Sequence, residues 1–300
     1  MSDAPPRNFL GLAPEDSALE SSGVVILPVP YEATTSYLGG ARGGPQAIVD
    51  ASRAVELYDH ELDDEPYLVG VHTAAPLALP ASGPEAALTA LRRAYAPLAA
   101  SGKFVIMLGG EHSVSVAPIL EWAARLRRQR RTLSVLQLDA HGDLRDEWEG
   151  TPYSHACAMR RVVEQVRLVQ VGIRAIAAEE RAVMRKHRVA TVFAEEMARS
   201  DRWQARAVSR LGPDVYVTID VDFFDPSLVP STGTPEPGGG GWYAALRLLE
   251  RVFRERNVVA ADVVELAPIP GVAAPDFLVA KLVYKLIGYR RTRRRRPRRA

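Results

Sequence analysis

The sequence is poor in cysteine and contains no long hydrophobic run. Cys157 is the only cysteine, which rules out an internal disulfide, and a lone thiol is most easily kept reduced inside a cell. No apolar run approaches the roughly 18 residues that a membrane-spanning helix needs. Residues 1–22 lack the basic start and apolar core of a secretory signal. We therefore predict a cytoplasmic protein without a membrane segment.

Acidic residues are absent from the C-terminal end. The segment Arg290–Ala300 holds eight arginines, so the net charge of +2 becomes 2 − 8 = −6 for the remaining residues. Arginines that repel one another around a proline predict an unfolded tail. Such a tail could contact nucleic acid or polyphosphate, although a solubilising extension is the simpler interpretation. We expect residues 1–289 to form one domain, because no repeat and no Gly/Ser-rich linker divides them.

Short runs of aliphatic and β-branched residues alternate with longer helical patterns. Helices are expected over 44–57, 84–100, 116–128, 242–256 and 275–287. Strands are expected over 24–30, 104–108, 133–139, 167–173, 190–194, 215–220 and 258–266. The strands are nearly continuous in apolar residues, which is typical of a parallel sheet covered by helices on both faces. We therefore predict an α/β fold with three α-β-α layers around a mainly parallel sheet.

Polar residues follow four of these strands, at the point where each strand ends. Because ligands bind beyond the carboxyl ends of parallel strands, we expect these side chains to meet at one edge. In 139–143 and 220–222 the acids and the histidine alternate along the chain, so they project to one side of an extended backbone. The eight carboxylates and imidazoles are Glu111, His112, Asp139, His141, Asp143, Asp220, Asp222 and Glu265.

Two imidazoles and four aspartates together predict a site for two metal ions. Clustered acids repel one another, and divalent cations remove that cost. The set is too rich in oxygen for a structural zinc site and suits Mn²⁺ best, with Ni²⁺, Co²⁺, Fe²⁺ and Zn²⁺ as alternatives. A pair of cations lowers the pKa of a shared water and supplies hydroxide as a nucleophile. For a single aspartate, a cap or turn would explain the residue equally well, but capping does not need histidines.

The order of these motifs resembles the ureohydrolase family of arginases, agmatinases and formiminoglutamases. The family patterns GGDHS, DAHxD and DxDxxDP occur here as GGEHS (109–113), DAHGD (139–143) and DVDFFDP (220–226). The resemblance runs from residue 28 to about 289 and implies an arginase-like fold, two Mn²⁺ ions and a homo-trimer or homo-hexamer. It implies that the metal ligands are His112, Asp139, His141, Asp143, Asp220 and Asp222.

The resemblance also implies catalytic roles. Glu265 matches the glutamate that binds the guanidinium group, His155 matches the histidine that shuttles a proton, and Asp143 completes the predicted catalytic set. A Cys157–His155 nucleophile is the alternative, but adjacent residues on an extended segment point to opposite sides, which favours a packing cysteine. Departures from the family are Glu111, expected to support a neighbouring histidine, and Ala156 after His155. A further departure is the glycine run 238–241, expected to loosen its loop. The remaining histidines, His60, His72 and His187, are assigned to structure or surface.

The resemblance and the local charge favour agmatine as the substrate, hydrolysed to putrescine and urea by attack of metal-bound hydroxide. Residues 144–150 contain three acids and no asparagine, which favours a cationic substrate tail over a carboxylate. Arg145 and Trp148 in this segment are candidate substrate contacts, although Arg145 could instead pair with a neighbouring acid. The first alternative is a 4-guanidinobutyrate, guanidine or other amidine hydrolase, and an arginase or formiminoglutamase ranks after it. A single-metal deacetylase, or an inactive relative that binds polyanions through its arginine tail, belongs to a different class.

Overall fold

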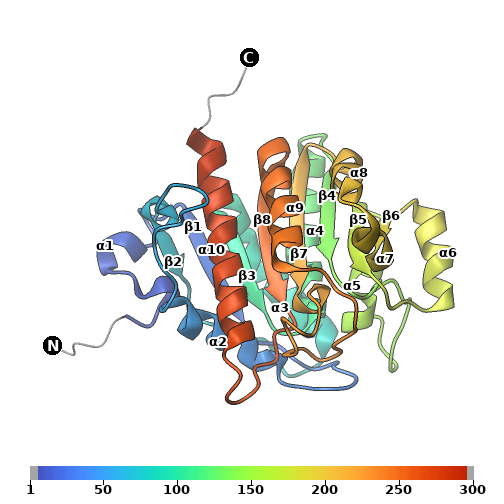
Figure 1. Ribbon diagram of the computed structural model, residues 1–300. Coiled ribbons are helices and arrows are strands. Elements are labelled where there is room, and N and C mark those ends of the chain that lie inside the picture. The colour runs from blue at the N-terminus through green and yellow to red at the C-terminus, as the bar shows by residue number, and fades with distance from the viewer. Residues whose placement is uncertain (1–5, 296–300) are drawn as a thin grey trace.

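An eight-stranded sheet runs through the centre of the chain, and every adjacent pair of its strands is parallel (Figure 1). This computed structural model describes residues 6–295. The order across the sheet is β2-β1-β3-β8-β7-β4-β5-β6. The strands are β1 (Val24–Val29), β2 (Val71–Thr73), β3 (Phe104–Gly109), β4 (Leu133–Leu138), β5 (Arg167–Ile173), β6 (Ala190–Phe193), β7 (Asp214–Asp220) and β8 (Asn257–Val264).

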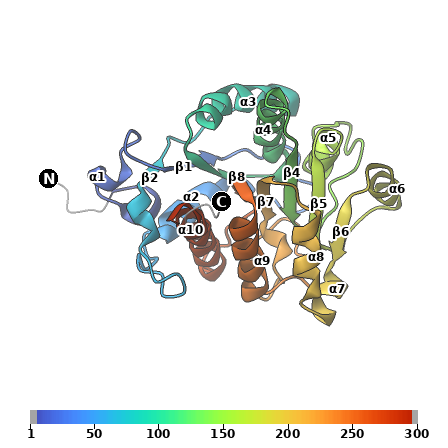
Figure 2. The ribbon, with the colours of Figure 1, turned by 90° about the horizontal axis from the view of Figure 1, so that it is seen from above.

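Helices cover both faces of the sheet, as the continuous apolar strands predict. Figure 2 shows α3, α4 and α5 on one face and α2, α8, α9 and α10 on the other. Every residue of β1, β3, β4 and β7 is buried, so the three-layer α/β fold is confirmed. The helices are α1 (Pro14–Ser17), α2 (Gly44–Ser52), α3 (Pro84–Ala100), α4 (Val116–Arg128), α5 (Ala158–Val162), α6 (Ala178–His187), α7 (Ala194–Arg199), α8 (Arg202–Arg210), α9 (Trp242–Glu255) and α10 (Ala274–Arg295).

Two helices differ by several residues in length from their predictions. Helix α2 ends at Ser52, short of residue 57, and the Ser52 hydroxyl turns back to donate to the carbonyl of Val49. Helix α10 continues to Arg295, so the prediction of an unfolded tail beginning at residue 290 is wrong for residues 290–295. Residues 296–300 of that predicted tail lie outside the described part of the chain.

The first arginines of the predicted tail are ordered because they find partners on the body of the fold. Arg290 donates to the carbonyl of Val258 at 3.0 Å, and its guanidinium lies 5.3 Å from the centre of the Phe104 ring. Arg291 pairs with Asp64 at 2.9 Å. Among the described helices, none is long and apolar enough to cross a membrane.

The strand order brings the predicted site residues together. Strands β3, β8, β7 and β4 are consecutive neighbours in the middle of the sheet. They are the four strands whose ends carry the predicted carboxylates and imidazoles. Parallel strands end at the same edge, so this order alone places the polar residues side by side.

Candidate metal centre

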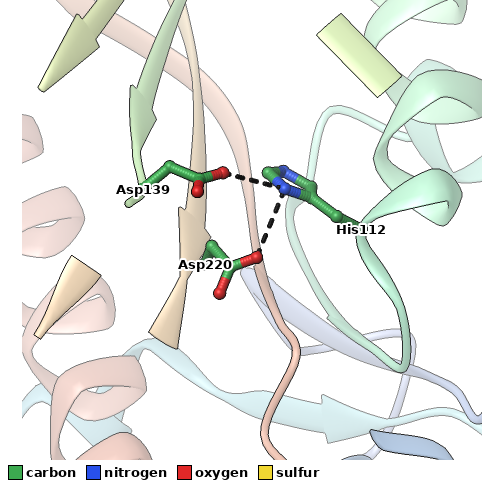
Figure 3. A group of neighbouring side chains, drawn as sticks. All are labelled: His112, Asp139 and Asp220. Atoms are coloured by element: carbon green, nitrogen blue, oxygen red, sulfur yellow. Dashed lines mark ion pairs between the residues drawn. The ribbon is translucent and has the colours of Figure 1, made fainter. Parts of the chain in front are cut away.

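Three side chains from three different strand ends meet in a buried cluster (Figure 3). His112 begins the short 3-10 helix that follows β3, Asp139 follows β4, and Asp220 is the last residue of β7. The Nδ1 atom of His112 lies 3.0 Å from Asp139 Oδ2 and 3.4 Å from Asp220 Oδ2. Asp143 adds a further carboxylate, with its Oδ2 atom 2.9 Å from the same nitrogen.

A second cluster adjoins the first and shares one residue with it. His141 Nδ1 lies 2.8 Å from Asp222 Oδ2 and 3.7 Å from Asp139 Oδ1. In each of two groups the candidate ligand atoms lie within 4.8 Å of one another: His112, Asp139 and Asp220 form one, and Asp139, His141 and Asp222 the other. Asp139 offers one oxygen to each group, which is the arrangement of a carboxylate that bridges two cations. The structure thus brings together all six predicted metal ligands.

The donor set fits divalent cations. A cation that binds nitrogen and oxygen at roughly 2.1 Å holds neighbouring ligand atoms about 3 Å apart, as they are here. His112 Nδ1 is buried and makes no hydrogen bond, despite three carboxylate oxygens within 3.4 Å. Its other nitrogen, Nε2, lies 2.9 Å from the Thr218 hydroxyl, so a proton on Nε2 leaves the Nδ1 lone pair for a metal.

Crowding of charges perturbs the pKa values of this centre in opposite directions. Burial raises the pKa of Asp220 well above its ordinary value, and the charges of Asp222 and Asp139 raise it further. Burial alone would raise the pKa of Asp139 as well, but the close contacts with His112 and His141 lower it. Burial lowers the pKa of His141, yet the charge of Asp222 and the contacts with Asp139 raise it to about 12. Without a metal, the carboxylates of the cluster therefore favour protonated histidines.

Buried side chains behind the cluster fix its ligands. Gln137 Nε2 donates to Asp139 Oδ2 at 2.7 Å, and Gln170 Nε2 on the neighbouring strand donates to Gln137 Oε1 at 2.7 Å. Behind His112, the Thr218 hydroxyl donates to Asp262 Oδ1 at 2.6 Å. None of these supports was predicted. Gln137 lies two residues before Asp139, so both side chains project to the same side of an extended backbone, which is the signal that points to Gln137.

The backbone takes unusual conformations at two predicted catalytic residues. Asp143 and Glu265 have φ angles of 52° and 66°, in the left-handed region that residues other than glycine rarely adopt. In the segment 109–113, Gly110 is needed because another part of the backbone lies very close to it. A Cβ atom on Gly110 would lie 1.9 Å from the Tyr31 carbonyl oxygen, so the two chain segments can approach only at a glycine.

Glu265 lies beside the metal ligands. Its Oε1 atom accepts the backbone N–H of His112 at 2.6 Å, and the side chain lines the cavity above the cluster. Burial raises the pKa of Glu265 to about 8, against the lowering effect of this hydrogen bond. Its second oxygen, Oε2, accepts no hydrogen bond within residues 6–295.

His155 lines the same cavity. Its Nδ1 atom is 3.3 Å from the Thr34 hydroxyl, and its Nε2 atom is 3.4 Å from the Ser36 hydroxyl. Glu111 is fully buried and accepts hydrogen bonds from the Thr34 N–H and hydroxyl. Glu111 thereby holds the loop that contacts His155, in line with its predicted supporting role.

The cavity has a volume of about 490 Å³ and a charged lining. Its walls include every predicted site residue except Asp139. They also include Arg174, Glu180 and Glu236, which sequence reasoning missed. Arg145 and Trp148 both line it, but Arg145 stacks on the Trp148 ring at 4.3 Å and pairs with Glu179 at 3.0 Å. The acids Asp146, Glu147 and Glu149, from which a cationic substrate was predicted, do not line the cavity.

The other sequence features have structural explanations. Cys157 is buried, and burial raises the pKa of its thiol to about 11, which excludes a reactive thiolate near neutral pH. In the glycine run 238–241, which was expected to loosen its loop, the Asp225 carboxylate accepts the N–H groups of Gly238 and Gly239. His60, His72 and His187 lie outside the cavity.

Comparisons with known proteins agree with this geometry. The Arginase family profile matches residues 22–288. The N(1)-aminopropylagmatine ureohydrolase of Synechocystis is 41% identical, over 95% of this chain and 94% of the relative. The agmatinase of Pyrococcus horikoshii is 33% identical, over 90% and 93% of the two chains. Among solved structures, the agmatine ureohydrolase of Thermoplasma volcanium aligns with a TM-score of 0.85 at 26% identity, covering 96% of each chain. Proclavaminate amidino hydrolase from Streptomyces clavuligerus aligns with a TM-score of 0.86 at 27% identity, covering 97% of this chain and 98% of that one.

Proposed function

Because this chain belongs to the arginase family, and is therefore a hydrolase acting on guanidino compounds, we propose that it converts a guanidinoalkylamine to urea and an amine with two divalent cations. Agmatine and its N1-aminopropyl derivative are the proposed substrates. The observation that carries the proposal is the pair of ligand groups that share Asp139 at the floor of a cavity lined by Glu265.

The proposed cations are Mn²⁺ ions. One would be held by His112, Asp139, Asp143 and Asp220, and the other by Asp139, His141 and Asp222. When bound, two such cations supply an activated water near neutral pH. Oxygen-rich ligation with two imidazoles supports manganese over zinc.

The remaining residues of the cavity position the substrate and move its protons. Glu265 Oε2 is placed to accept N–H groups of the planar guanidinium, because Oε1 is already occupied by the His112 N–H. This contact would orient the guanidinium carbon toward the ligand cluster. His155, held by the Thr34 and Ser36 hydroxyls, is the group that would deliver a proton to the departing amine.

The cavity lining favours a substrate with a cationic far end over one with a carboxylate. Two arginines line the cavity, and both are already engaged. Arg145 is neutralised by Glu179, and the Arg174 guanidinium donates to backbone carbonyls that include those of Gly172, Asp222 and Glu236. A carboxylate-bearing substrate such as arginine or 4-guanidinobutyrate would thus meet guanidinium groups whose donors are already bonded within the protein.

The choice between the two guanidinoalkylamines rests on the comparisons. N(1)-aminopropylagmatine ureohydrolases of Synechocystis and Thermus thermophilus are each 41% identical to this chain, against 33% for the Pyrococcus agmatinase. This difference supports N1-aminopropylagmatine as a second candidate substrate beside agmatine.

The test is urea release by manganese-loaded protein. We expect urea from agmatine or N1-aminopropylagmatine, and at least about a hundredfold lower kcat/KM for arginine, 4-guanidinobutyrate and guanidine. An Asp222→Ala variant serves as the inactive control. Efficient urea release from 4-guanidinobutyrate or arginine, with little from the two amines, would contradict the proposal.

A further inference from the structure

Five charged side chains line the cavity besides the metal ligands and His155, and four of them already have partners. They are Arg145, Arg174, Glu180, Glu236 and Glu265. A side chain with satisfied partners gains little from a ligand, whereas a charged group without one is available to bind it. The partners of these five residues therefore indicate where a charged substrate group can bind.

The two arginines are held by the protein itself. Arg145 lies between the Glu179 carboxylate and the Trp148 ring. Arg174 Nη2 donates to the carbonyls of Asp222 at 2.6 Å and Glu236 at 2.7 Å, and its Nε donates to Pro237 at 3.0 Å. Through these hydrogen bonds Arg174 connects the 233–239 loop to the segment that contains the metal ligand Asp222.

Two of the three glutamates are also occupied. Both oxygens of Glu180 accept backbone N–H groups, from Leu144 at 2.8 Å and from Ala177 at 2.6 Å. Glu265 accepts the His112 N–H and is buried beside the metal ligands, where the guanidinium group would bind. Neither is placed to receive the far end of a substrate.

Glu236 is different, because its carboxylate has no hydrogen bond or ion pair within residues 6–295. Its side chain is half-buried in the cavity wall. Its backbone is fixed, since its carbonyl and that of Asp222 accept from the same Arg174 nitrogen. The loop that carries it begins at Gly233, where an added Cβ would lie 4.0 Å from Glu265 Oε2, and leads outward to Glu236.

We propose that Glu236 binds the ammonium group of the substrate and thereby selects guanidinoalkylamines. This inference rests on the proposed function, because it assigns the second charged group of the same substrate. Glu265 would hold the guanidinium at the inner end, and Glu236 the nearest amine of the alkyl chain at the outer end. In N1-aminopropylagmatine this amine is the secondary ammonium, and the added aminopropyl group would extend toward the mouth.

The contact is a charge-assisted hydrogen bond in a partly desolvated wall. Such a bond changes affinity by about 10- to 100-fold. Because the ammonium lies away from the reacting carbon, its loss should appear mainly in KM.

The test compares Glu236→Gln with wild type on agmatine and on N-butylguanidine, which has the same chain length and no ammonium. We expect KM for agmatine to rise by about 10- to 100-fold, with no comparable change for N-butylguanidine. Glu236→Asp should retain part of the preference. The matched control is Glu147→Gln, which removes the same charge from an exposed site outside the cavity and should leave both substrates unchanged.

Other results would contradict either the role of Glu236 or the proposed function. An equal effect of Glu236→Gln on both substrates, or no effect on either, would overturn the role of Glu236 while leaving the proposed function intact. Manganese content and thermal unfolding of the variants, compared with wild type, separate a lost contact from a misfolded chain. If wild type released no urea from either guanidinoalkylamine, the proposed function itself would fail, and the role of Glu236 with it.

Discussion

At the residue scale, the ligands of the centre could be predicted because their chemistry is visible in the sequence. Asp139, His141 and Asp143 alternate along the chain, and a histidine placed between acids is not explained by a helix cap or a turn. Their supports could not be predicted, because Gln137 acts on Asp139 through a partner, Gln170, that only the pairing of β4 with β5 places beside it. Glu236 was missed for a similar reason. Its importance depends on which other charges in the cavity are already paired.

Proton binding by the histidines predicts how metal affinity depends on pH. The surrounding aspartate carboxylates raise the pKa values of His112 and His141, the latter to about 12, which favours the protonated form of both imidazoles in the metal-free protein. A cation binds only the neutral imidazole and must displace these protons. Manganese affinity should therefore fall as pH falls, by at least about tenfold per pH unit. Calorimetric titrations between pH 8 and 6, in buffers of different ionisation enthalpy, would measure affinity and proton release together. A pH-independent affinity would contradict this assignment.

At the element scale, long apolar strands and proline-initiated helices were predictable, whereas short or charged elements were not. Strand β2 has three residues, too few for a periodic pattern. Helix α10 continues into the arginine-rich segment because Arg290 and Arg291 find partners in β8 and in the 57–66 loop. The sequence shows only that the arginines are adjacent and repel one another. Their partners, Val258 and Asp64, lie far away in the sequence, so the pattern could not reveal these contacts.

Helix α10 also depends on a buried ion pair. Lys285 Nζ lies 2.7 Å from Asp59 Oδ1, and their side chains are 2% and 1% exposed. Lys285→Met would leave the Asp59 charge buried without its cation and should lower the free energy of unfolding by about 3–5 kcal/mol. Denaturant unfolding measures this loss. Lys186→Met, at an exposed position of α6, should change stability by no more than about 0.5 kcal/mol. A Lys285→Met variant as stable as this control would show that the pair does not hold the helix.

At the scale of the whole molecule, the strand order explains why one edge of the sheet can hold two cations. Strands β3, β8, β7 and β4 are neighbours in space but far apart in sequence, so each contributes its terminal residues to one centre. Helices lie on both faces of the sheet (Figure 2), and residues at the carboxyl ends of the central strands line the cavity. Asp139, at the end of β4, links the two ligand groups.

The metal content of manganese-loaded protein after gel filtration tests this account most directly. Two ions per chain are expected for wild type. Asp139→Ala removes the ligand that both groups share and should retain none, whereas His141→Ala disrupts one group and should retain about one ion. A wild-type chain that holds a single ion, or an Asp139→Ala variant that keeps two, would contradict the shared two-metal centre.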